Sequence, residues 1–171
     1  MKTPIYLLTI LCMLLVSSSC KKKSSETTYD GNNIVFSSAF DTHADLVIWS
    51  QSSGGQAVID QNTAKLTATD GCFQFETIDL IPVETGKTYT LKFKGKVIAS
   101  QAGDPVFCAG DFLIYIMQGS TVLLSQSFGN YPDWVQKSFS FQATKPVPIS
   151  IKFLIGTKRG VWIDDLSLTE Q

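Results

Sequence analysis

The stretch that decides the fold is Thr88–Val97, TYTLKFKGKV, in which apolar and polar residues alternate. Tyr89, Leu91 and Phe93 share one parity, and lysines occupy the other. Successive side chains of a β-strand point to opposite faces of the sheet, so this period of two predicts a strand with one buried and one solvated face. A sheet with an apolar face must cover it with a second layer, which the rest of the chain has to supply.

Other parts of the chain have the same strand character. Residues 147–155 (VPISIKFLI) and 138–143 (SFSFQA) alternate in the same way, and residues 112–117 (FLIYIM) are apolar at both parities. Groups of Gly with Asn, Asp, Ser or Thr separate these runs, and no stretch shows capped helical periodicity. The sequence therefore predicts an all-β fold, an antiparallel β-sandwich of the jelly-roll kind.

The composition limits the function classes. The chain has 171 residues with 14 basic and 15 acidic side chains, which suits one domain with a formal charge of -1. Such a balance gives no basic field for a nucleic acid, so we expect no nucleic-acid partner. The single His and the absence of a phosphate loop, a nucleophile elbow or an HExxH motif give little support to catalysis.

The first twenty residues, MKTPIYLLTILCMLLVSSSC, have a basic tip, an apolar run and small residues that end at Cys20. This pattern is typical of a secretory signal peptide, and its apolar run is shorter than the roughly 20 residues of a membrane-spanning helix. The end resembles the lipobox of bacterial lipoproteins, although Ser17 stands where that motif usually has Leu. We therefore expect a lipoprotein signal peptide over residues 1–19 and lipidation at Cys20; an ordinary cleaved signal is the alternative.

A polar segment, KKKSSETT, follows Cys20 and predicts a flexible tether over residues 20–33, ahead of a jelly-roll domain over residues 34–171. The lipid would anchor the protein to a membrane of the bacterial cell envelope. Surface export in Gram-negative groups is associated with acidic residues after the lipidated Cys. The lysines found here therefore favour the periplasmic side of the outer membrane.

Two cysteines, Cys72 and Cys108, remain once Cys12 leaves with the signal and Cys20 carries lipid. A chain exported from the reducing cytosol can form a disulfide between them, and two buried free thiols are the alternative. No Cys-x-x-Cys spacing supports a zinc site.

Three stretches occur in a familiar order: residues 81–91 (IPVETGKTYTL), 134–141 (WVQKSFSF) and 161–168 (VWIDDLSL). Together they resemble carbohydrate-binding modules of the family 4, 9 and 22 type, which have a galactose-binding-like jelly-roll fold. The resemblance implies a non-catalytic module that recognises oligo- or polysaccharide by aromatic stacking. It also implies that Trp49 and Trp134 fill the core.

The parity of the apolar residues changes at Asp164 and Asp165, which predicts a β-bulge between Ile163 and Leu166. Carboxylates at such a corner can cap backbone N–H groups or bind a hard cation. The resemblance implies a structural calcium ion held by Asp41 and Asp165. A hydrogen-bonded corner without metal is the alternative.

Sugar recognition needs flat aromatic faces with hydrogen-bonding groups beside them. The side chains that we expect to point away from the core, and therefore to bind the ligand, are Trp162, Tyr115, Gln74, Glu76 and Lys92. An outward Trp near a Tyr, a Gln and a Glu would form a suitable surface. The alternative function is a structural or adhesive subunit that binds other envelope proteins, and a glycoside hydrolase or lyase has the least support.

Overall fold

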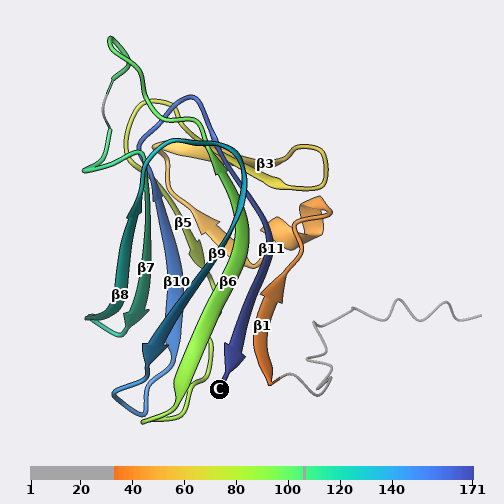
Figure 1. Cartoon of the computed structure of the whole chain (residues 1–171), viewed down its shortest axis with the longest axis vertical. Coiled ribbons are helices and arrows are strands. Elements are labelled where there is room, and N and C mark those ends of the chain that lie inside the picture. The colour runs from red at the N-terminus through yellow and green to blue at the C-terminus, as the bar shows by residue number, and fades with distance from the viewer. Residues whose placement is uncertain (1–32, 106) are drawn as a thin grey trace, which may run out of the picture.

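The computed structural model describes residues 33–105 and 107–171 (Figure 1). The predicted signal peptide, Cys20 and nearly all of the predicted tether lie outside these residues. The described chain forms two antiparallel β-sheets and one short 3-10 helix, η1 (His43–Leu46). This arrangement confirms the prediction of an all-β antiparallel sandwich.

One sheet has six strands. They run in the order β3-β4-β11-β6-β9, with β1 also paired to β11. Their bounds are β1 (Ile34–Ser38), β3 (Gly55–Ile59), β4 (Ala64–Ala68), β6 (Thr88–Val97), β9 (Tyr131–Gln142) and β11 (Val161–Glu170). The first and last strands of the domain are therefore neighbours in this sheet.

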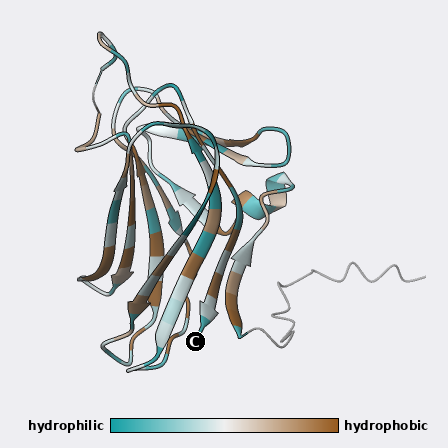
Figure 2. Ribbon diagram, in the orientation of Figure 1, coloured by the Kyte–Doolittle hydropathy of each residue, from teal (hydrophilic) through white to brown (hydrophobic). Residues whose placement is uncertain are grey.

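The other sheet has five strands in the order β2-β5-β10-β7-β8. Their bounds are β2 (Trp49–Gln51), β5 (Phe73–Thr77), β7 (Phe112–Gln118), β8 (Thr121–Phe128) and β10 (Ile149–Ile155). Most neighbours in both sheets are distant in sequence, so the chain crosses repeatedly between the two layers. Figure 2 shows polar and apolar residues alternating along the strands, as the period of two requires.

The core lies between the sheets and is rich in aromatic side chains. Leu91 and Phe93 of β6 are buried, and Trp49 is only 3% exposed. The Trp49 ring stacks on Phe75 with 4.6 Å between ring centroids. The prediction of a core position is therefore confirmed for Trp49.

The same prediction is wrong for Trp134, whose side chain is 44% exposed. Trp134 has the parity of Gln136 and Ser138, which face solvent from β9, whereas Phe141 of the opposite parity is buried. The pairing of β6 with β9 shifts between Gly95 and Val97, next to Trp134. The side of β9 on which Trp134 lies therefore sets its exposure, against what the family resemblance implied.

The predicted bulge at Asp164 and Asp165 is confirmed. The register between β11 and β6 shifts between Asp164 and Ser167, and Asp165 has a φ of 48°. Ile163 and Leu166 are both buried although their parities differ. The extra residue turns the second half of β11 so that its apolar side again faces the core.

Cys72 and Cys108 form a disulfide, with their Cα atoms 5.1 Å apart, so the structure has the bridge rather than two free thiols. The bridge ties the residue before β5 to the long connection between β6 and β7. Among the described residues, no helix is long and apolar enough to cross a membrane.

Candidate functional site

The sandwich divides the five predicted ligand residues between two opposite outer faces. Gln74, Glu76 and Tyr115 belong to β5 and β7 of the five-stranded sheet, whereas Trp162 and Lys92 belong to β11 and β6 of the six-stranded sheet. The expected surface that joins Trp162 to the other aromatic and polar residues is therefore wrong. Parity assigns a side chain to one face of its strand, but only strand pairing assigns the strand to a sheet.

The outer face of the five-stranded sheet carries a rank of polar side chains across all of its strands. Cross-strand pairing places Glu76 between Ser50 and Lys152, Lys152 beside Tyr115, and Tyr115 beside Ser125. Directly opposed residues have Cβ atoms about 5 Å apart, so each side chain of the rank can reach the next. We call this surface, with Gln74 beside it, the Tyr115 face.

An ion pair fixes the middle of the rank. Lys152 Nζ lies 3.1 Å from Glu76 Oε2, and Ser150 Oγ donates a hydrogen bond of 2.8 Å to Glu76 Oε1. Both charged side chains are about three-quarters covered, so water screens this pair less than it screens a fully exposed one. The pair holds the Lys152 ammonium group against Glu76 of β5, while Tyr115 of β7 is the cross-strand partner of Lys152 on its other side.

A shallow pocket of about 350 Å³ opens on the Tyr115 face. Its lining combines the polar side chains of Gln74, Tyr115 and Lys152 with the apolar side chains of Met117 and Leu154. Gln74 and Leu154 are cross-strand partners, so the apolar strip runs alongside the polar rank. The surface therefore offers an aromatic ring, apolar contacts and planar hydrogen-bonding groups within one area.

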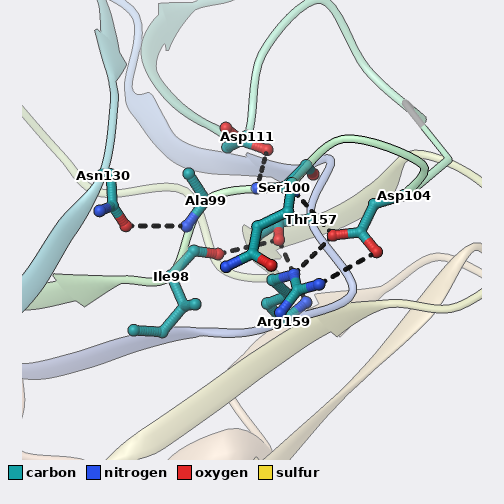
Figure 3. Close-up of polar contacts among 9 residues, drawn as sticks. Ile98, Ala99, Ser100, Asp104, Asp111, Asn130, Thr157 and Arg159 are labelled. Atoms are coloured by element: carbon teal, nitrogen blue, oxygen red, sulfur yellow. Dashed lines mark hydrogen bonds and ion pairs between the residues drawn. The ribbon is translucent and has the colours of Figure 1, made fainter.

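The connection between β6 and β7 lies at one end of this face, and several contacts hold it in place. Cys72, which lines the pocket, is bonded to Cys108 of the loop. Figure 3 shows the polar contacts of the same loop: Asp111 accepts a hydrogen bond of 3.0 Å from the Ser100 N–H, and Arg159 pairs with Asp104.

Thr157 and Asn130 extend this network to neighbouring connections. The Thr157 hydroxyl donates to the Ile98 carbonyl over 2.9 Å, and Asn130 Oδ1 accepts from the Ala99 N–H over 3.1 Å (Figure 3). The hydrogen bond from Arg159 holds the pKa of Asp104 below its usual value, and the Gln101 N–H acts in the same direction. The carboxylate therefore stays ionised and paired well below neutral pH.

On the opposite face, Trp162 lines a second pocket, of about 400 Å³. Trp134, Asp60, Gln61 and Asp164 line it as well, and we call it the tryptophan pocket. Lys92 lies on the same strand as Lys94 and Lys96, which both line the pocket, but it is not itself a lining residue. The sequence analysis missed the exposure of Trp134 here, and it missed Lys152 on the Tyr115 face.

The two carboxylates at the bulge already have partners within the protein. Asp165 forms an ion pair with Lys94, and Asp164 Oδ1 accepts a 2.8 Å hydrogen bond from the Asp165 N–H. No group of three or more His, Cys, Asp or Glu side chains in residues 33–105 and 107–171 could hold a metal ion. These contacts do not test calcium binding by Asp41 and Asp165, which stays a prediction.

Burial raises the pKa of Asp164 at this corner. The Asp165 N–H opposes that effect, the negative charges of Asp165 and Asp41 add to it, and the positive charge of Lys94 opposes it more weakly. The ionised form of Asp164 therefore destabilises the fold, and the Asp165 N–H and Lys94 together do not fully offset this cost.

His43, the single histidine, lies exposed in η1.

No protein-family model matches the chain, and no curated protein matches it. Solved structures do match. A CBM4 module is 21% identical with a TM-score of 0.56, over 72% of this chain and 86% of the module. The BiXyn10A CBM1 module in its apo form is 16% identical with a TM-score of 0.57, over 81% of this chain and 99% of the module.

The N-terminal cellulose-binding domain of Cellulomonas fimi β-1,4-glucanase C is 17% identical with a TM-score of 0.56, over 77% of this chain and 93% of that domain. At these identities the likeness concerns the fold, and the residues of the two faces must carry the argument about function. The described chain has the jelly-roll fold of carbohydrate-binding modules.

Proposed function

We propose that this protein is a non-catalytic carbohydrate-binding module that holds an oligo- or polysaccharide on its Tyr115 face. The observation that carries the proposal is the rank of Glu76, Lys152 and Tyr115 across the middle of an outer sheet face. The fold shared with carbohydrate-binding modules supports the same conclusion.

The chemistry of the face suits a sugar chain. The Tyr115 ring and the side chains of Met117 and Leu154 can cover the C–H side of pyranose rings. The Glu76 carboxylate can accept hydrogen bonds from sugar hydroxyl groups, and the Gln74 amide can both accept and donate them. These groups project from strands rather than from loops, so little backbone ordering is needed on binding. The face is a surface rather than an enclosed cavity, so a long chain can lie across it.

The proposal includes an anchor at Cys20, in the outer membrane with the domain on the periplasmic side. Figure 1 shows the C-terminus next to the start of β1, and Ile34 pairs with Thr169 in the adjacent strand. A tether that joins the domain at residue 33 would leave from this end. The loop that carries Cys108 would then lie at the far end, away from the membrane.

The test is affinity electrophoresis of the full chain, purified in detergent, through gels that contain xylan, barley β-glucan, galactomannan or laminarin. We expect at least one polysaccharide to retard the protein and Tyr115→Ala to reduce the retardation. Ser138→Ala changes an exposed residue on the other sheet and is the matched control.

Two results would contradict the proposal. Retardation that Tyr115→Ala leaves unchanged would exclude the Tyr115 face as the binding surface. A folded protein that no polysaccharide retards would instead favour the alternative, a subunit that binds other proteins of the envelope.

A further inference from the structure

The tryptophan pocket is lined by an exposed aromatic side chain, that of Trp134. Trp134 is 44% exposed at the rim of a pocket of about 400 Å³. A large exposed aromatic ring forgoes the free energy of its own burial, about 25 cal/mol for each Å² that stays in water. A ligand that covers the Trp134 ring would recover part of that free energy.

The second indole is held rigidly. Trp162 Nε1 donates a hydrogen bond of 3.2 Å to Asp60 Oδ2. Its ring lies against Gly160, where an added Cβ would come within 2.8 Å of it. The ammonium groups of Lys65 and Lys96 lie 5.1 Å and 4.9 Å from the ring centroid. Because Gly160 and the two ammonium groups already contact the Trp162 ring, Trp134 is the ring on which a ligand can stack.

Hydrogen-bonding groups surround the two rings. Asp60 uses Oδ2 for both Trp162 and Lys65, so its Oδ1 has no hydrogen-bond partner within the described residues. Gln61 lies in the connection between β3 and β4 (residues 60–63), where Asp60 and Thr63 exchange backbone hydrogen bonds and Gln61 has a φ of 52°. Asp164 lines the same pocket from the bulge of β11.

The charges of the lining balance. Two carboxylates, Asp60 and Asp164, are matched by two ammonium groups, Lys94 and Lys96. A neutral ligand with many hydroxyl groups suits such a lining better than an ion does, because each hydroxyl can both donate to a carboxylate and accept from an ammonium group.

We infer that the tryptophan pocket is a second carbohydrate site, which binds one sugar residue of a neutral glycan with its ring stacked on Trp134 and its hydroxyl groups bonded to Asp60 and Asp164. This goes beyond the proposed function, because it does not require the Tyr115 face to be occupied. Two sites on opposite faces let one molecule hold two glycan chains at the same time.

Tryptophan fluorescence reports this pocket separately from the Tyr115 face. The chain has three tryptophans, of which Trp49 is buried in the core. The other two, Trp134 and Trp162, both line the pocket, whereas the lining of the Tyr115 face includes none. The full chain in detergent is titrated with hexasaccharides of glucose, xylose and mannose, and with an oligogalacturonate as the acidic comparison. We expect a neutral hexasaccharide to change the emission and the oligogalacturonate to leave it unchanged.

Calorimetric titration with the same hexasaccharide gives the number of sites. We expect two ligands per chain for the wild type and one for Trp134→Ala, with a loss of at least about tenfold in affinity at the pocket. Gln136→Ala, two positions along the same face of β9, is the matched control and should still bind two. Tyr115→Ala should bind one and keep the emission change.

The outcomes separate the two proposals. One ligand per chain, with constant emission and no effect of Trp134→Ala, overturns the second site and leaves the Tyr115 face. One ligand that is lost in Trp134→Ala but kept in Tyr115→Ala supports the pocket and overturns the Tyr115 face. Binding of the oligogalacturonate alone, or no emission change with any hexasaccharide, overturns the inference.

Discussion

Removing the disulfide should destabilise the domain strongly. The bridge joins Cys72 and Cys108, which are 36 residues apart in sequence. In the chain-entropy description, closing a loop of that length removes enough freedom from the unfolded chain to stabilise the fold by about 4 kcal/mol. For a domain of this size such a loss corresponds to a decrease in Tm of about 10–15 °C.

The assay is urea denaturation of the full chain in detergent, for the wild type and for Cys72→Ala/Cys108→Ala, followed by tryptophan emission. The double variant should lose about 4 kcal/mol in the free energy of unfolding. It should also have a larger m-value, because its unfolded state is less compact and exposes more surface.

The single variants provide the control. Either Cys72→Ala or Cys108→Ala already removes the cross-link, so each should lose almost as much stability as the double variant does. A total loss below about 1 kcal/mol, or single effects that add up to the double effect, would refute the argument from loop closure.

Three further predictions concern the six-stranded sheet. Asp164→Asn should raise the Tm at pH 7, because the pKa of Asp164 is raised in the folded protein and its ionised form therefore destabilises the fold. The increase in Tm should disappear below the ordinary Asp pKa of about 3.9, where the carboxyl group is protonated in both states. Thermal melts of both proteins across this pH range check the prediction. Gly160→Ala should cost about 1–3 kcal/mol and change the Trp162 emission, because Gly160 has a φ of 113° and an added Cβ meets the indole; urea denaturation with an unchanged midpoint would contradict this. Calcium should leave the Tm unchanged because Lys94 already pairs with Asp165, whereas a rise that a chelator reverses would support the site at Asp41 and Asp165 implied by the resemblance.

The period of two along Thr88–Val97 was enough to predict a strand with a buried and a solvated face, and in the structure Leu91 and Phe93 are buried while Lys92 and Lys94 are exposed. The parity change at Asp164 and Asp165 predicted the bulge in the same way. Both succeeded because side-chain alternation is a local property of the backbone.

The alternation of residues along the chain did not predict which site residues lie together. Trp162 and Tyr115 both point outward, but β11 and β7 belong to different sheets, so their side chains lie on opposite faces. At Trp134 the resemblance implied burial, but the side chain lies on the solvent-facing side of β9 with Gln136 and Ser138 and is exposed.

The sequence by itself therefore determined the strand character, the alternation of side chains between the two faces and a net charge close to zero. The tertiary structure decided which strands share a sheet, that Cys72 meets Cys108, and that Glu76, Lys152 and Tyr115 form one rank while Trp134 and Trp162 form a pocket elsewhere. The physical reason is that alternation depends on neighbours along the chain, whereas strand order depends on long-range pairing between segments far apart in sequence.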